Sequence, residues 1–163
     1  MLIYLIRHAE AAPLGHGGTT HDAERPLTED GLAQCRALAL GLHKRQARFD
    51  LVLTSPLVRA VQTAEGMLKH WPAPAPELRH CDELTPGTKR RQLARYLRNC
   101  TTEQIALVGH QPDLGQFAAW LLGSNKVHIE LAKGGVALIS CDDEPAKGTG
   151  SLLWLVTPAW LAD

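Results

Sequence analysis

Short, continuous apolar runs recur along the chain, and polar residues with turn formers separate them. Such runs are typical of strands that helices cover on both faces, whereas a half-exposed strand would alternate between apolar and polar residues. The pattern predicts five strands, at residues 2–6, 51–54, 105–108, 136–139 and 152–156.

Helical periodicity fills the segments between these strands. Apolar residues three or four apart between positions 32 and 42 predict a helix with Thr28 as its N-cap. A second helix is expected to begin at Pro56, preceded by a capping Ser55, and to end at the proline-rich stretch 71–76. Two more are expected, from about Lys89 to Arg98 and from Asp113 onward.

Alternating strands and helices with short connections are typical of an α/β fold. We therefore expect a three-layer α/β/α sandwich with a mostly parallel central sheet and right-handed crossovers. The chain has no repeats or linker, so residues 1–163 are expected to form a single domain. The glycine- and histidine-rich segment from Ala11 to Asp22 is expected to be an irregular loop.

Composition and charge narrow the function classes. The 17 basic and 17 acidic residues balance, so no net field favours binding to nucleic acid or to a membrane. The apolar start of the chain is too short to span a bilayer and lacks a signal-peptide pattern, which favours a cytoplasmic protein. The four cysteines lack the spacing of a zinc or redox site and are expected to be reduced thiols.

Cationic and imidazole side chains follow three of the predicted strands. Arg7 and His8 end the first, Arg59 lies in the helix after the second, and His110 follows the third. Ligands of open parallel sheets bind at the carboxyl ends of the strands, so these four side chains are expected to meet at one edge.

Two guanidinium groups and two imidazoles suit a phosphoryl group without a metal ion or cofactor. A positive field would keep His8 neutral, so that its ring can attack phosphorus while His110 stabilises the charge from the opposite side. Ser55 lacks the glycine-flanked turn of a serine nucleophile. The other six histidines lack metal-site spacing, and we expect no metal.

Several ordered motifs carry a resemblance to a known family. Residues 5–11, 25–31, 55–64, 83–87, 108–112 and 133–137 match it in order and spacing. The chain resembles the histidine phosphatase superfamily, also called phosphoglycerate mutase-like, and within it the small bacterial branch typified by the phosphohistidine phosphatase SixA. The resemblance implies that His8 accepts phosphate, that Arg7, Arg59 and His110 bind it, and that Arg25 lines the entrance.

The sequence departs from the family pattern in two respects. Ala9 stands where the family usually has glycine, and a positive φ there would strain the backbone. The inserted region that carries a proton-donating glutamate in larger members is absent. Glu83 is the nearest candidate proton donor, and Glu10 and Asp22 are weaker ones. A phosphohistidine substrate needs such an acid less, because imidazole can depart already protonated on its other nitrogen.

Three functions therefore stand open. The first is a metal-independent phosphatase that works through phospho-His8 on a phosphorylated protein, such as a histidine-containing phosphotransfer domain, and releases inorganic phosphate. The second is a phosphomonoesterase for a small sugar or nucleotide phosphate. The third is a non-catalytic module that binds phosphorylated partners.

Overall fold

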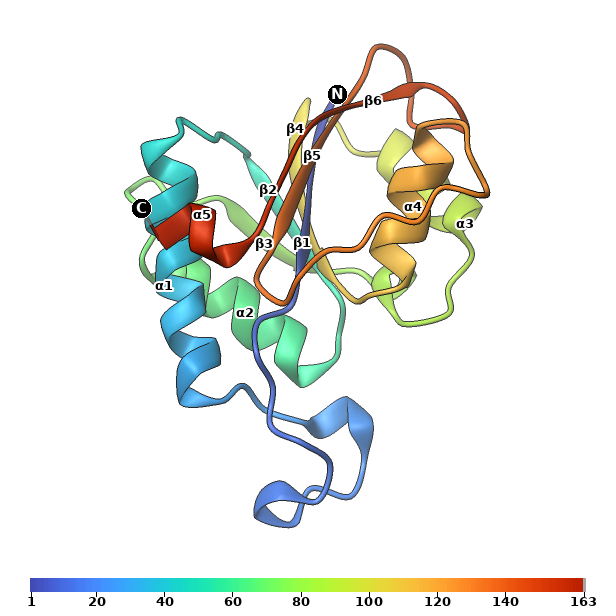
Figure 1. The fold of residues 1–163 in the computed structure, drawn as a ribbon. Coiled ribbons are helices and arrows are strands. Elements are labelled where there is room, and N and C mark those ends of the chain that lie inside the picture. Colours follow the sequence, from blue (N-terminus) through green and yellow to red (C-terminus); the bar gives the residue numbers. More distant parts are fainter. Residues whose placement is uncertain (163) are drawn as a thin grey trace.

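The computed structural model describes residues 1–162, which form a six-stranded sheet between two layers of helices (Figure 1). The strand order is β3-β2-β4-β1-β5-β6. Strands β3, β2, β4 and β1 are parallel, and β5 is antiparallel to both of its neighbours, so β6 runs in the same direction as β1. The strands are β1 Leu2–Arg7, β2 Leu51–Thr54, β3 Glu77–His80, β4 Gln104–Gly109, β5 Val136–Cys141 and β6 Gly150–Val156.

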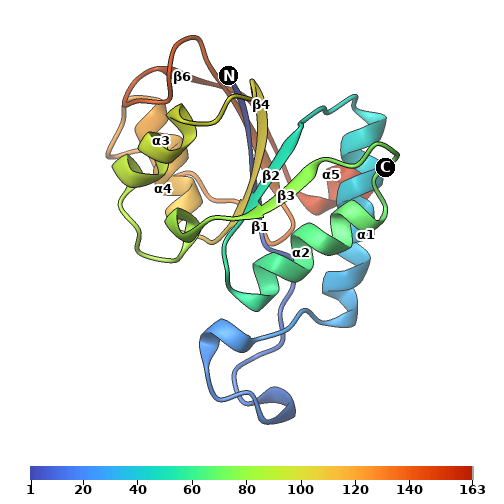
Figure 2. The same cartoon turned by 180° about the vertical axis from the view of Figure 1, so that it is seen from behind.

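Helices cover both faces of the sheet (Figures 1 and 2). One face carries α1 (Glu29–Lys44), α2 (Val58–Lys69) and α5 (Pro158–Ala162), and the other carries α3 (Arg90–Arg98) and α4 (Asp113–Leu121). Three short 3-10 turns, η1 (His16–Gly18), η2 (Asp22–Glu24) and η3 (Asp82–Leu84), lie in the connections. A separate apolar core fills the space under each helical layer, so the predicted three-layer sandwich with a mostly parallel sheet is confirmed.

All five predicted strands are present, but β3 was not predicted. Its residues, Glu-Leu-Arg-His, contain no apolar run, and only Leu78 is partly buried. The strand forms at the edge of the sheet because its backbone pairs in parallel with β2, an interaction that side-chain patterning does not reveal. The short helix α5 was also missed.

The predicted start of α2 was wrong. This helix begins at Val58 rather than at Pro56, with Leu57 as its N-cap, although it ends at Lys69, before the prolines, as predicted. Helix α4 begins at Asp113, as predicted, with Pro112 as its N-cap, and the Asp113 carboxylate accepts a hydrogen bond from the Gly87 N–H at 3.0 Å. Leu32, the first residue of the apolar stripe expected for α1, is exposed.

The predicted cap of α1 is confirmed, since the Thr28 hydroxyl accepts a hydrogen bond from the Gly31 N–H at 3.1 Å. Gly31 also lets α1 approach the chain just after β1, because a Cβ there would lie 2.1 Å from the Glu10 carbonyl oxygen. The loop from Ala11 to Asp22 projects beyond the carboxyl end of β1 (Figure 1). None of the helices within residues 1–162 is long and apolar enough to cross a membrane.

Candidate active site

The four side chains expected at the sheet edge come together there. Strands β1 and β4 are neighbours in register, and the His8 N–H donates to the Gly109 carbonyl at 2.9 Å, which puts His8 beside His110. The two ring centroids lie 5.2 Å apart. Arg59, from the first turn of α2, brings its Nε to 3.3 Å from His8 Nε2. All three side chains are buried, and Arg7 raises the positive potential at both imidazoles.

The His8 ring is held in a defined tautomer. Its Nδ1 lies 2.7 Å from the Ala9 carbonyl oxygen, which can only accept, so Nδ1 carries the proton and Nε2 keeps its lone pair. Burial lowers the pKa of His8 to about 4, and the positive charges of Arg59 and Arg7 add to this effect. The positive field predicted from the sequence is present, but burial is the larger cause. His8 is therefore neutral, with a nucleophilic nitrogen facing Arg59.

His110 is oriented by a hydroxyl group. Its Nε2 lies 2.8 Å from Ser55 Oγ, which also accepts a long hydrogen bond of 3.4 Å from the Leu57 N–H. No other acceptor for this hydroxyl occurs within residues 1–162, so the Ser55 proton points at Nε2 and leaves the His110 proton on Nδ1. Nδ1 is buried without a hydrogen-bond partner among these residues. Burial lowers the pKa of His110 to about 3, so the ring is a neutral donor.

The prediction that Ser55 caps α2 was wrong, since the N-cap is Leu57 and no side chain caps this helix. Ser55 is fully buried and its main polar contact is His110. A signal for this role existed in the sequence, because Ser55 directly follows β2 and so lies at the same sheet edge as the residue after β4.

The two arginines of the site differ in their partners. Arg7 donates from Nη1 to the Leu131 carbonyl at 2.7 Å, whereas its Nε is buried without a partner among the described residues. Each guanidinium nitrogen of Arg59 has a partner: Nε faces His8, Nη1 donates to the Asp22 carbonyl at 2.7 Å and Nη2 to the Asp22 Oδ2 at 3.0 Å. An unpaired buried donor costs about 1–3 kcal/mol, and an anion beside Arg7 would satisfy it.

Arg25 reaches the site through Asp22. It donates from Nη1 to Asp22 Oδ1 at 2.8 Å and from Nε to the Ala12 carbonyl at 2.7 Å. The hydrogen bond from Arg25, assisted by the charge of Arg59, holds the pKa of the Asp22 carboxyl below its usual value. Asp22 is thus an ionised carboxylate that bridges the two guanidinium groups at the mouth of the site.

Comparison with known proteins decides the family. The profile of the Histidine phosphatase superfamily (branch 1) matches residues 3–88, more than half of the chain. The chain belongs to the histidine phosphatase superfamily. It is 34% identical over 167 residues to an uncharacterized protein of Picosynechococcus sp., with 99% of each chain covered.

More distant relatives carry functional names. The chain is 29% identical over 163 residues to the phosphohistidine phosphatase SixA of Escherichia coli, with 97% of this chain and 94% of SixA covered. A structure of the protein histidine phosphatase SixA complexed with tungstate superposes with a TM-score of 0.84, at 26% identity and 98% coverage of both chains. The predicted resemblance to the SixA type is thereby confirmed.

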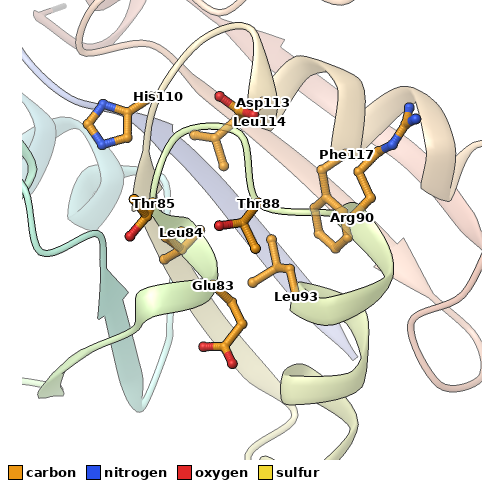
Figure 3. Close-up of a pocket in the computed structure, with 10 residues that line it drawn as sticks. All are labelled: Glu83, Leu84, Thr85, Thr88, Arg90, Leu93, His110, Asp113, Leu114 and Phe117. Atoms are coloured by element: carbon orange, nitrogen blue, oxygen red, sulfur yellow. The ribbon is translucent and has the colours of Figure 1, made fainter.

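The two glutamates considered as proton donors do not join the centre of this histidine phosphatase. Glu83 accepts a hydrogen bond from the Cys81 thiol at 3.4 Å, and its side chain points away from His110 (Figure 3). Glu10 pairs with Lys133 at 2.7 Å. Asp22 is the carboxylate that contacts the site arginines, and a proton-donor role for Glu83 stays a prediction.

Thr63 links the segment after β1 to α2 in the histidine phosphatase. Its hydroxyl accepts from the Ala9 N–H at 3.0 Å and donates to the Arg59 carbonyl at 2.6 Å, so it ties the backbones that carry His8 and Arg59. This role of Thr63 was not predicted, although Thr63 follows Arg59 by four residues and so lies on the same helix face.

Ala9 fits the backbone of this histidine phosphatase without a left-handed conformation. Within residues 1–162, Gln46 is the one non-glycine residue with a positive φ. Ala9 is also fully buried. Alanine in place of glycine at this position therefore introduces none of the backbone strain that a positive φ would cause. No group of three His, Cys, Asp or Glu side chains in the described part of the chain could hold a metal ion.

Proposed function

We propose that this histidine phosphatase hydrolyses phosphohistidine on a protein, through a phosphohistidine intermediate on His8 and without a metal ion. The observation that carries the proposal is the neutral His8 ring, with Nδ1 hydrogen-bonded to the Ala9 carbonyl, Nε2 facing Arg59 and the His110 ring centroid 5.2 Å away. The similarity to SixA over nearly the whole chain supports the same substrate class. The related SixA structure holds tungstate, a tetrahedral oxyanion like phosphate.

In the first step, the lone pair of His8 Nε2 attacks phosphorus and the N–P bond of the substrate breaks. The electron pair of that bond goes to the departing imidazole, which leaves neutral because its other nitrogen already carries a proton. The Nδ1–H of His8 keeps its hydrogen bond to the Ala9 carbonyl, and this carbonyl oxygen stabilises the positive charge that the phosphorylated ring gains. Arg7, Arg59 and His110 would stabilise the transferred phosphoryl oxygens.

In the second step, water attacks phosphorus from the side opposite Nε2 and the His8–phosphorus bond breaks. The electron pair returns to Nε2, one water proton leaves to solvent, and inorganic phosphate is released with the other. Neither step needs a protonated carboxyl group. This agrees with the ionised state of Asp22 and with the orientation of Glu83.

A small phosphomonoester is the second candidate substrate. The chain is 33% identical over 120 residues to the adenosylcobalamin/alpha-ribazole phosphatase of Salmonella typhimurium, with 74% of this chain and 52% of that protein covered. An alkoxide leaving group has to be protonated as it departs, so this route would require a carboxylic acid. Asp22 is the nearest carboxylate to Arg59, and Glu83 is the residue predicted from the sequence.

Rates on two substrate classes separate the candidates. The purified full chain is assayed in excess chelator on a phosphorylated histidine-containing phosphotransfer domain and on a panel of sugar and nucleotide monophosphates. We expect the phosphoprotein to be preferred, and the Glu83→Gln and Asp22→Asn variants to retain its hydrolysis. A preference for a monoester that either variant abolishes would overturn the proposal in favour of the second candidate.

Rapid-quench trapping tests the intermediate itself. A labelled phosphoprotein is mixed with enzyme and quenched within milliseconds, and we expect acid-labile, base-stable label on His8 and none on the His8→Ala variant, which should also lose turnover. Tight binding without label or turnover would instead establish the non-catalytic binding module.

A further inference from the structure

A cationic groove lies outside the site described above, where the start of α3 meets the end of α4. Its volume is about 400 Å³. Its lining includes Trp120 and Asn125 but no acidic residue. The other lining residues are four basic side chains, Lys89, Arg90, Arg91 and Lys147. Lys89, Arg91 and Lys147 are exposed.

The charges of this groove are uncompensated. Within residues 1–162, none of the four basic side chains takes part in an ion pair. Lys89, Arg90 and Arg91 also stand at the N-terminus of α3, whose first turn contains no acidic residue. Cations at this end are unfavourable because the helix dipole is positive there. The arrangement therefore costs stability in the free protein and favours an anionic partner.

The groove is connected to the active site by Arg90. This residue lines the groove and also the small pocket that contains His110. In Figure 3 His110 and the Arg90 guanidinium lie on opposite sides of that pocket, and Arg90 is the residue that the pocket shares with the groove. The pocket has an accessible volume of only about 20 Å³, room for about one water molecule, so a small substrate at His8 would not extend through it to the groove.

A protein substrate would cover both the active site and the cationic groove. A stable protein interface buries about 800 Å² on each partner, far more than one phosphorylated side chain. When a phosphohistidine enters the site, the surface of the protein around it lies over the neighbouring surface of the enzyme. Acidic residues on that surface would meet the unpaired cations.

We propose that the groove lined by Lys89, Arg90, Arg91 and Lys147 binds an acidic surface of the phosphohistidine protein, an inference that rests on the proposed function. Nucleic acid is the less favoured occupant. The chain has no net charge, and Trp120, the aromatic residue of the groove, is only 8% exposed and offers no face on which a base could stack.

Matched peptides test this proposal. Two peptides of about 20 residues carry a central phosphohistidine, one with glutamate-rich and one with lysine-rich flanks, since about ten extended residues span roughly 30 Å. Free phosphohistidine is the third substrate. The variant combines Lys89→Ala, Arg91→Ala and Lys147→Ala. The control combines Arg36→Ala, Arg48→Ala and Lys69→Ala, which removes the same charge from exposed positions on the α1 and α2 side.

For the natural sequence and the control, we expect kcat/KM at low ionic strength to be about tenfold higher on the glutamate-rich peptide than on the lysine-rich peptide. The difference between the two peptides should shrink as salt is added. The triple groove variant should lose most of this preference and keep its rate on free phosphohistidine. Equal rates of the natural sequence on the two peptides would contradict the proposed role of the groove. An equal loss of rate on all three substrates in the triple groove variant would contradict it as well. Failure of the natural sequence to hydrolyse any of the three would contradict the proposed function instead.

An RNA of about 20 nucleotides provides the competing outcome, because single-stranded nucleic acid also follows cationic grooves. We expect it to bind weakly and equally to the natural sequence and the triple variant. Tight binding that the variant abolishes, without any preference between peptides, would assign the groove to nucleic acid and overturn the proposal.

Discussion

The guanidinium group of Arg59 donates two hydrogen bonds to Asp22, one to its carbonyl oxygen and one to its carboxylate. The same group lies 3.3 Å from the nitrogen of His8 that would attack phosphorus. A phosphoryl group bound to Arg59 must therefore share or displace the Asp22 contact. Because Asp22 belongs to the segment beyond β1, we expect this loop to affect how tightly the site binds an anion.

Replacing Asp22 should strengthen anion binding. The Asp22 carboxylate is 57% exposed, so its pair with Arg59 is worth less than about 1 kcal/mol. We expect Asp22→Asn to lower the inhibition constant of inorganic phosphate about two- to fivefold. The Glu24→Gln variant, which removes a carboxylate from the same 3-10 turn, should leave this constant unchanged. An unaltered inhibition constant in Asp22→Asn would show that the carboxylate does not compete with phosphate.

Removing Arg59 should impair catalysis strongly. Loss of one preorganised donor typically lowers kcat about a hundredfold, and we expect a loss of at least this order for Arg59→Ala. Arg59→Lys should not restore the rate, because an ammonium group cannot reproduce the planar fork that contacts both His8 and the anion. Arg36→Ala on α1 is the control. A near-normal rate in Arg59→Ala would remove Arg59 from the proposed mechanism.

The buried imidazoles make the protein sensitive to acid. The pKa values of His8 and His110 fall to about 4 and about 3 in the folded state, from 6.5 in the unfolded chain. Between these values the unfolded state binds more protons, so the free energy of unfolding decreases as the pH falls from 6.5 to about 4. Chemical denaturation at several pH values measures this slope, which should be shallower in His8→Gln. An unchanged slope in that variant would contradict a neutral, buried His8.

Ser55 should set the proton position on His110. We expect Ser55→Ala to lower kcat about fivefold, equivalent to one hydrogen bond of about 1 kcal/mol, while Ser55→Thr retains most of the rate. Nitrogen NMR of His110 distinguishes this role from a general structural one. The spectrum should show the Nδ1–H tautomer in the natural sequence and a mixture of tautomers in Ser55→Ala. A single, unchanged tautomer in Ser55→Ala would contradict the assignment.

Ala9→Gly should bring no gain in activity. Because Ala9 does not adopt a positive φ, glycine mainly adds freedom to the unfolded chain, and the free energy of unfolding should decrease by about 0.4–1 kcal/mol. Denaturation and steady-state assays measure the two effects. A several-fold increase in kcat would show that alanine distorts the segment that follows β1.

Much of the site was accessible from the sequence because parallel strands impose a simple rule. Residues that follow parallel strands lie at the same edge of the sheet, so Arg7, His8 and His110 could be placed together without coordinates. Arg59 followed from its position in the first turn after a strand. The apolar run of β1 and the cap at Thr28 are local features that neighbouring residues specify.

Other contacts depended on how distant segments meet. The pairing of Asp22 with Arg59 joins a glycine-rich loop to a helix 37 residues later, and that of Ser55 with His110 spans 55 residues. Strand β3 exists through backbone pairing with β2 rather than through an apolar pattern. The basic groove joins the start of α3 to Lys147, 56 positions beyond Arg91.

The layered fold and the identity of the groups at the sheet edge could be predicted from the chain alone, because hydrophobic periodicity and strand direction are local properties. Only the folded arrangement shows which hydrogen-bond partner each of those groups has, and hence which nitrogen of each imidazole keeps its proton. These hydrogen bonds and proton positions depend on contacts between polar groups that are far apart in the chain. They also depend on how deeply each side chain is buried, which the pattern of residues along the chain does not give.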